Sequence, residues 1–385
     1  MFSRPSRIEI DLDKIEKNIE AIRGHIPEST KIIAIVKSNA YSMGDVEIVR
    51  HLTEIGISNF AVAATSEGIR IRREFKDVEI LVLGYTPEYL YESSIRNNLT
   101  FTVYSYDAAK KMDEVSKKIG MTTNIHIKID TGMNRLGFKP TNESLTEIEN
   151  ISKLSNINIT GIFSHFADSE ANPEFTKIQF SKFIEFTERL EAKGIEFGIK
   201  HINNTGGVFS YPEYSLNAVR PGIAIYGTHD GDIEEALNFG LEFIASIKSE
   251  VAHVKMIQKG EGVSYGLVFK AEKPTEVATI PIGYSDGLLR TMSGKIDVLI
   301  KGKRCRQIGV ICMDQLMVDV TGIECEVGDE VVLVGEQGSE KIWLNEYSEA
   351  AEECNTSFLT HLSPRLCRVY TKDGNIIKST DEILN

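Results

Sequence analysis

Apolar runs rich in β-branched residues alternate with amphipathic stretches along roughly the first 230 residues of the chain. The stretches between the runs carry apolar residues every three or four positions, as Ile15, Ile19 and Ile22 do before the first run, which is typical of helices with one buried face. The runs predict eight strands, at 31–36, 59–63, 79–83, 99–104, 124–130, 157–164, 198–203 and 218–226. Such alternation favours parallel strands with helical crossovers, and eight units indicate an α/β fold of the (β/α)8 TIM-barrel type.

A doubly wound open sheet is the competing interpretation. It requires a glycine-rich loop after its first strand, and KSNAYSMG after residue 36 is not GxGxxG. Beyond residue 227 the pattern changes to alternating segments separated by turn signals, with one helix-like stretch at 344–353. The alternating segments are 244–256, 276–281, 297–301, 307–310, 316–320 and 330–334. The sequence therefore predicts a barrel domain over 1–230 and a mostly β C-terminal domain over 231–385.

Composition and charge narrow the class of protein. The net charge of −13 disfavours binding to nucleic acid and to anionic membrane surfaces. The N-terminus has no apolar signal-peptide core, and no apolar run approaches the roughly 18–20 residues of a membrane span. None of the five cysteines form a CxxC pair, which suits a reducing compartment. We therefore expect a cytoplasmic protein that binds neither nucleic acid nor membranes.

Five of the eight predicted strands end in ionisable or hydrogen-bonding side chains, at the carboxyl end where barrel enzymes place their chemistry. Each side chain has an ordinary structural alternative, such as a solvated lysine, a buried histidine or a surface ion pair. Lys128 fits these alternatives poorly, because the alternation in HIKID turns it toward the barrel interior, where an unpaired lysine is unfavourable. The residues are Lys37; Lys128, Asp130 and Arg135; His165; Asn203, Asn204 and Thr205; and Arg220.

Lys37 at the end of the first barrel strand indicates Schiff-base chemistry, because a desolvated amine loses its proton more easily and attacks carbonyl groups. If the carbonyl belongs to pyridoxal phosphate, the site also needs a phosphate cradle. Thr205 and the backbone around Gly222 and Ile223 are candidates for it. A barrel metal site built from histidine and aspartate is a weaker alternative, since no HxH or HExxH spacing supports it.

AIVKSNAYSMG at 34–44 resembles the pyridoxal-phosphate lysine motif of the alanine racemase family. Seven further segments resemble the family in the same order, and together they span nearly the whole chain. They are HIKIDTGMNRLGF (126–138), GIFSHFA (161–167), HINNTGG (201–207), VRPGIAIYG (219–227), GVSYGLVF (262–269), IPIGYSDG (280–287) and GVICMDQ (309–315).

The resemblance implies an isomerase that interconverts L- and D-alanine with pyridoxal 5'-phosphate and supplies D-alanine for cell-wall synthesis. It implies a homodimer with shared active sites, in which Lys37 forms the internal aldimine and is one base, and Tyr265 of the opposite subunit is the other. Lys128 matches a position that is often carbamylated in the family. The resemblance assigns cofactor contacts to Tyr41, His165, Asn203, Thr205, Arg220, Gly222 and Ile223, and substrate contacts to Arg135, Tyr284 and Met313.

One position departs from the family. Many members carry a tyrosine near the C-terminus that packs against the catalytic tyrosine, and Pro364 stands there in this chain. A racemase of serine or of broader specificity is therefore one alternative. A non-catalytic pyridoxal-phosphate-binding protein is another, which is disfavoured because it would need neither a second domain nor Tyr265.

Overall fold

The structure is a computed structural model that describes residues 3–230 and 233–384. The chain forms two compact units. One comprises Asn18–Ala40 and Asp45–Ile225, and the other comprises Met1–Lys17, Tyr41–Gly44 and Tyr226–Asn385.

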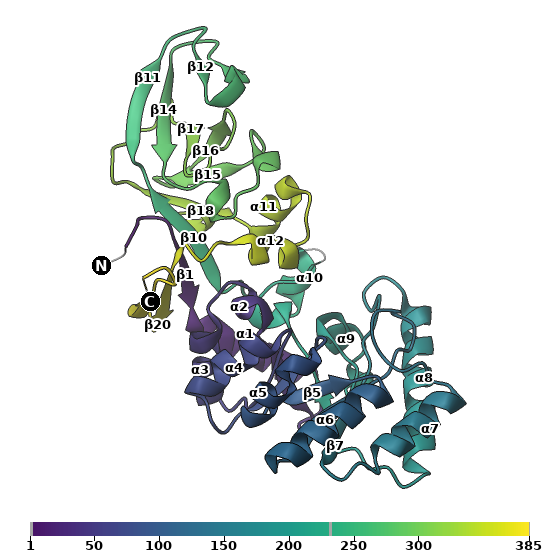
Figure 1. Cartoon of the computed structure of the whole chain (residues 1–385). Helices are drawn as coiled ribbons and strands as arrows, with labels where there is room; N and C mark the ends of the chain where they lie inside the picture. The colour runs from purple at the N-terminus through teal and green to yellow at the C-terminus, as the bar shows by residue number, and fades with distance from the viewer. Residues whose placement is uncertain (1–2, 231–232, 385) are drawn as a thin grey trace. The chain divides into compact units, whose positions relative to one another are not determined.

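The first unit is a closed barrel of eight parallel strands in chain order (Figure 1). The predicted (β/α)8 barrel is confirmed, and each strand overlaps one of the predicted runs. The last strand is much shorter than its run, because the chain leaves the sheet at Arg220 and enters the 3-10 helix η3 (Ile223–Tyr226). The barrel strands are β2 (Lys31–Ile35), β3 (Asn59–Val62), β4 (Glu79–Val82), β5 (Thr100–Val103), β6 (Thr123–Lys128), β7 (Ile157–Phe163), β8 (Ile199–His201) and β9 (Ala218–Val219).

Helices precede or connect the barrel strands and bury the faces that the sequence predicts. Ile15, Ile19 and Ile22 of α1 are at most 1% exposed. The helix termini follow ordinary capping chemistry: in α6, the Ser105 hydroxyl accepts a hydrogen bond from Ala108 N, and Gly120 ends the helix with a left-handed φ of 68°. The helices are α1 (Leu12–Gly24), α3 (Asp45–Glu54), α4 (Thr65–Glu74), α5 (Tyr91–Arg96), α6 (Tyr106–Ile119), α7 (Asn142–Ile151), α8 (Pro173–Glu191) and α9 (Thr205–Ser210), with 3-10 helices η1 (Glu88–Leu90) and η2 (Pro212–Tyr214).

The second unit is built on an eleven-stranded sheet in the order β11-β14-β17-β16-β15-β18-β10-β1-β20-β21, with β19 paired to β18. The predicted mostly β domain is confirmed. Its strands are β1 (Arg7–Asp11), β10 (Ala245–Glu250), β11 (His253–Ile257), β14 (Thr275–Ile280), β15 (Asp297–Ile300), β16 (Lys303–Ile308), β17 (Leu316–Asp319), β18 (Glu330–Gln337), β19 (Glu340–Ile342), β20 (Cys367–Lys372) and β21 (Asn375–Thr380).

Shorter elements complete this unit. A separate hairpin pairs two two-residue strands, and the predicted helix at 344–353 is present as α11. The helices α10 and α12 and the split of 244–256 into two strands were not predicted. These elements are β12 (Gly262–Val263), β13 (Phe269–Lys270), α10 (Ile233–Asn238), α11 (Leu344–Ala351), α12 (Asn355–His361), η4 (Tyr265–Leu267), η5 (Tyr284–Asp286) and η6 (Arg290–Met292).

The N-terminal strand lies in the β unit. Strand β1 pairs antiparallel with β10 and parallel with β20, and its Ile8 and Ile10 are fully buried. The predicted barrel domain 1–230 therefore includes a strand that belongs to the second sheet. The predicted boundary between 230 and 231 adjoins residues outside the described part of the chain.

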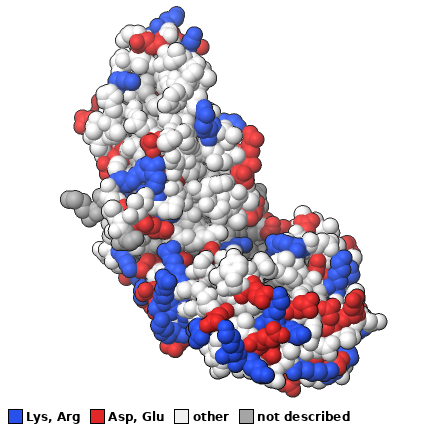
Figure 2. All heavy atoms as spheres, viewed as in Figure 1, with Lys and Arg blue, Asp and Glu red and all other residues white. Residues whose placement is uncertain are grey.

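On the face drawn in Figure 2, acidic and basic side chains are interspersed over the barrel unit, while the β unit carries broad stretches of other residues. Among the described residues, no helix combines the length and the apolar character needed to cross a lipid bilayer.

Candidate active site

Lys37 follows the carboxyl end of β2 and is partly buried. Burial, and then the positive charge of Arg135, lower the pKa of its amine, while the Glu67 carboxylate opposes them. Within the described part of the chain, no hydrogen bond or ion pair engages the Lys37 amine. A larger fraction of this amine is therefore neutral at neutral pH than in an ordinary lysine.

The turn after Lys37 is a left-handed helical turn without glycine. Ser38, Asn39 and Ala40 have φ values of 54°, 55° and 52°, and Tyr41 continues at 54°. Consecutive residues with side chains rarely adopt this conformation, which costs roughly 1–2 kcal/mol per residue. The segment α2 (Lys37–Tyr41) is therefore strained, as backbone at functional sites often is.

One carboxylate holds the start of this turn. Glu67 Oε1 accepts a hydrogen bond of 2.7 Å from Ser38 N, and Oε2 accepts from Ala63 N and Ala64 N at 2.8 and 3.0 Å. Glu67 thus ties the residue after Lys37 to the loop between β3 and α4. It was not among the predicted site residues.

Arg220 is the centre of a buried network. Its guanidinium donates to Ser164 O at 2.7 Å and Ile202 O at 2.9 Å, and to the Nδ1 atoms of His201 at 2.5 Å and His165 at 3.1 Å. Burial, and then Arg135, lower the pKa of Arg220 to about 9, so the guanidinium stays charged at neutral pH. Its Nε atom donates to no partner among the described residues.

Arg220 fixes the tautomers of three histidines. Because arginine only donates, His201 and His165 must accept at Nδ1 and carry their protons on Nε2. His201 Nε2 then donates to His126 Nδ1 at 2.9 Å. Burial, and then the charge of Arg220, lower the pKa of all three imidazoles, that of His126 to about 3, and keep them neutral.

Lys128 lies inside the barrel near this network. It is 6% exposed, its Nζ donates to Ile129 O at 2.8 Å, and it lies 5.3 Å from the centre of the Phe163 ring. Burial, and then the charge of Arg220, lower the pKa of Lys128 to about 7. Arg135 is exposed in the loop after β6, and its charge also lowers this pKa.

The predicted phosphate ligands of the barrel lie close together. Gly222 N donates to Thr205 Oγ1 at 3.0 Å, and Ile223 follows in η3. Asn203 is fully buried and donates to Gly207 O and Tyr211 O, but its Oδ1 atom accepts no hydrogen bond from the described residues. The carboxyl end of the barrel therefore holds most of the predicted cofactor-binding residues and one unsatisfied acceptor.

Tyr41 belongs to the β unit, where its buried ring lies 4.7 Å from that of Tyr226. Burial, and then the charge of Asp230, raise the pKa of the Tyr41 hydroxyl. Tyr265 in η4 is also in this unit, and its side chain is 70% exposed.

Tyr284 and Met313 are brought together in the β unit. Tyr284 N donates to Cys312 O at 3.0 Å, and Ser285 N donates to Met313 O at 2.9 Å. Gly283 makes this approach possible, since a Cβ atom there would lie 2.4 Å from Cys312 O. Backbone hydrogen bonds thus hold together the two segments that carry the predicted substrate-binding residues Tyr284 and Met313.

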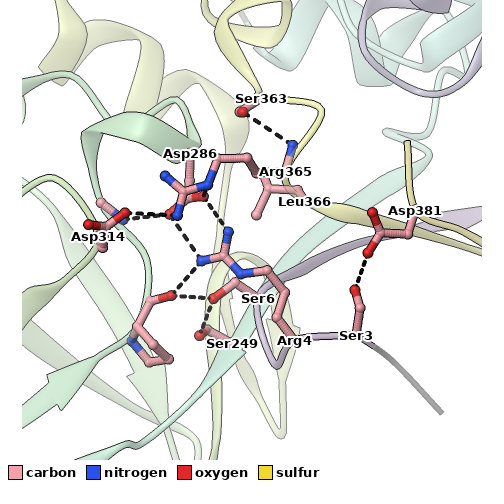
Figure 3. Close-up of polar contacts among 12 residues, drawn as sticks. Ser3, Arg4, Ser6, Ser249, Asp286, Asp314, Ser363, Arg365, Leu366 and Asp381 are labelled. Atoms are coloured by element: carbon pink, nitrogen blue, oxygen red, sulfur yellow. Dashed lines mark hydrogen bonds and ion pairs between the residues drawn. The ribbon is translucent and has the colours of Figure 1, made fainter. Parts of the chain in front are cut away.

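Two arginines contact acidic residues next to Tyr284 and Met313. Figure 3 shows Arg4 beside Asp286, and Arg365 beside Asp286 and Asp314. The fully buried carboxylate of Asp286 accepts from Arg4 at 2.5 and 3.2 Å and from Gly283 N at 3.0 Å. Arg365 lies 3.7 Å from Asp286 and donates to Asp314 Oδ1 at 2.8 Å. This cluster fixes η5, which carries Tyr284, to the segment that carries Met313.

Sequence reasoning missed several of these residues. His201 lies in the HINNTGG segment quoted above. In the predicted strand 198–203, the alternation places His201 on the same face as Asn203, and this pattern could have identified it. Glu67 occupies the third position of α4, where carboxylates often cap a helix, but the preceding Ala64 lacks the usual N-cap side chain. Pro364 is exposed between α12 and β20.

Comparison with known proteins places both units in one family. The alanine racemase N-terminal domain family matches residues 10–230, and the alanine racemase C-terminal domain family matches residues 244–370. "Alanine racemase 1" of Clostridium acetobutylicum is 42% identical over 377 residues, which cover 97% of each chain. The alanine racemase of Clostridium tetani is 42% identical over 379 residues, again 97% of each chain.

A solved structure agrees with these relatives. The alanine racemase of Clostridium difficile 630 has a TM-score of 0.94 and 35% sequence identity, and the alignment covers 100% of both chains. Since the match extends over the barrel, the β unit and both sets of site residues, the chain belongs to the alanine racemase family.

Proposed function

We propose that this chain interconverts L- and D-alanine with pyridoxal 5'-phosphate as its cofactor, and that Lys37 and Tyr265 are its two bases. The observation that carries the proposal is the Lys37 amine, which is partly buried, has a lowered pKa and has no hydrogen-bond or ion-pair partner among the described residues. The names of the relatives favour alanine over serine or a broader substrate range.

The residues around Lys37 fit an anionic cofactor. The charge of Arg135 lowers the pKa values of Lys37, Lys128 and Arg220, and the charge of Arg220 also lowers that of Lys128. Positive charge therefore accumulates at this end of the barrel. The nearby carboxylate of Asp130 already accepts two backbone hydrogen bonds, from Gly132 N and Asn134 N. A phosphate, a phenolate oxygen and a substrate carboxylate would supply the missing negative charge.

Each residue has a task in this proposal. Lys37 holds the cofactor, Arg220 faces its ring nitrogen, and His165 lies beside the ring. Thr205, Gly222, Ile223 and Tyr41 hold the phosphate, Asn203 supports the cofactor, and Arg135, Tyr284 and Met313 bind the substrate.

When bound, pyridoxal phosphate withdraws electrons from the substrate and thereby acidifies its α-proton. Lys37 and Tyr265 exchange that proton with the α-carbon from opposite faces, which permits reaction in both directions. Arg220 presents only N–H donors, so a ring nitrogen facing it stays an acceptor and withdraws electrons less strongly. Arg220 thus limits decarboxylation and transamination.

We propose that the active enzyme is a homodimer in which Tyr265 acts on a substrate held by the second copy. The apolar residues that follow Tyr265 support a partner surface here, since Leu267 and Val268 are 55% and 69% exposed. We also propose that the enzyme works in the cytoplasm, where it supplies D-alanine for cell-wall synthesis. The five cysteines are free thiols, which suits that compartment.

Purified protein should turn over both L- and D-alanine in the presence of pyridoxal phosphate, and circular dichroism would follow the loss of optical activity. L- and D-serine serve as the comparison. Equal or faster turnover of serine would contradict the assignment of alanine, and no turnover of either amino acid would contradict a racemase.

We further propose that Lys128 is carbamylated. Its pKa of about 7 leaves much of the amine neutral at neutral pH. A neutral amine adds to carbon dioxide, forms an N–C bond and releases a proton. The resulting carbamate is an anion that can pair with Arg135 and remove the unfavourable burial of a cation.

In buffer with ¹³C-labelled bicarbonate, the enzyme should show a lysine carbamate resonance in ¹³C NMR. The signal should weaken as the pH falls below about 7, because protonation of the amine reverses the addition. Lys128→Ala should abolish the signal, whereas Lys139→Ala, which changes an exposed lysine in the segment between β6 and α7, should keep it. A signal that survives Lys128→Ala would refute the assignment.

A further inference from the structure

The backbone immediately before Tyr265 is in an unusual conformation. Ser264 has φ 64° and ψ −172°, a region that is populated almost only by glycine. Gly266 and Leu267 also have positive φ values, of 72° and 49°. Strands β12 and β13 pair as a hairpin on either side of this turn. Three of the four residues 264–267 therefore have positive φ values, and the exception is the exposed Tyr265 itself.

The Ser264 side chain explains how a residue other than glycine persists there. Its Oγ donates to Val310 O at 2.6 Å and lies 3.3 Å from Cys312 Sγ. The two segments meet closely at Gly309, where a Cβ atom would lie 2.7 Å from Val263 O. The hydroxyl therefore connects the turn to the segment that leads to Met313.

The Tyr265 side chain receives no comparable support. It is 70% exposed, and no hydrogen bond or ring contact engages it among the described residues. Among the described residues, the backbone of the turn is therefore what restricts the directions in which its hydroxyl can point. Without the Ser264 anchor, that backbone would no longer be held to a single set of φ and ψ values.

We propose that Ser264 is a positioning residue for Tyr265: its hydroxyl holds a strained turn that aims the tyrosine at the substrate. This inference rests on the proposed role of Tyr265 as a base. Glycine at position 264 would adopt the same φ and ψ without strain but would lack the anchor. Stability and catalysis should therefore respond in opposite directions to Ser264→Gly.

The decisive comparison uses Ser264→Gly, Ser264→Ala and Ser264→Thr. Ser264→Gly should have a Tm equal to or above that of the parent enzyme, while kcat/KM for alanine falls on the order of 10- to 100-fold. Ser264→Ala, which keeps the strain and loses the anchor, should lose both stability and activity. Ser264→Thr, which keeps the hydroxyl, should retain more activity than either of them.

Isotope effects separate positioning from a merely structural role. If the step at Tyr265 slows, the α-deuterium effect on kcat/KM should rise for the alanine enantiomer whose α-proton faces Tyr265. It should fall for the other enantiomer, whose α-proton Lys37 removes. A smaller amount of correctly folded enzyme would change neither effect. Lys301→Gly is the matched control, because it relieves a positive φ of 50° in the β15–β16 hairpin and should leave both effects unchanged.

A readout without turnover uses 3-fluorotyrosine incorporated only at position 265 of the full-length protein. Its ¹⁹F resonance should be single and sharp with Ser264, and broadened or split in Ser264→Gly. Unchanged isotope effects and an unchanged resonance in Ser264→Gly would overturn the inference. Tyr265→Phe tests the underlying role separately: full activity of Tyr265→Phe would refute Tyr265 as a base, whatever Ser264 does.

Discussion

Lys37→Ala should reduce racemisation of alanine by roughly a thousandfold or more, because it removes both the attachment point of the cofactor and one of the two bases. Lys37→Arg should be as inactive, since a guanidinium stays protonated and forms no Schiff base. The partly buried Lys37 amine, whose pKa burial and Arg135 lower, is the nucleophile expected at this strand end.

Borohydride reduction of the holoenzyme gives an independent readout. It should fix one cofactor per chain, and peptide mapping should place it on Lys37. Lys31→Ala is the matched control, because Lys31 is exposed at the opposite end of the same strand, β2, and its loss should leave activity and labelling intact. A label on another lysine would show that the assignment of Lys37 is wrong.

Mixing inactive Lys37→Ala with inactive Tyr265→Ala should restore activity if Tyr265 acts in the second subunit. In a heterodimer of these variants, one site then carries both defects and the other is intact. With random exchange of subunits, about one quarter of the parent activity should return. Since both starting variants are nearly inactive, this is a large effect against a low background.

Subunit exchange must be demonstrated, for example with differently tagged chains that are purified through both tags. The double variant Lys37→Ala/Tyr265→Ala mixed with Lys37→Ala is the negative control, because no intact site can form. Heterodimers that remain inactive would indicate that Lys37 and Tyr265 serve the same active site from one chain.

The barrel was predictable because its strands are buried on both faces and therefore appear as short, nearly continuous apolar runs, such as 31–36 and 79–83. Strand β1 illustrates the limit. It was not among the predicted strands. The alternation in RIEID is typical of a strand, but it contains no information about which sheet the strand joins. Its partners, β10 and β20, lie far away in the sequence.

The site was predictable only in part, because a local sequence pattern identifies strand ends but not the contacts made by residues in turns. Lys37 and Arg220 stand at strand ends, so the fold itself marks them. Tyr265 was identified from family resemblance, since an exposed tyrosine in a short turn has no distinguishing pattern. The contacts of Glu67 with Ser38 and of Ser264 with Val310 depend on backbone dihedral angles in the two turns. The residue types in these turns do not predict those angles.

The position of β1 between β10 and β20 has a consequence for biosynthesis. Ile8 and Ile10 pair with Arg368 and Tyr370, which a ribosome adds about 360 residues later. At roughly 5–20 residues per second, β1 waits on the order of 20 to 70 seconds for that partner, while the whole barrel sequence is translated. Both edges of β1, which carries the buried residues Ile8 and Ile10, are open until β10 is translated, and the edge that pairs with β20 stays open for the whole interval. An open strand edge is a hazard for aggregation. The nascent chain therefore depends on protection of its first strand until its last strands emerge.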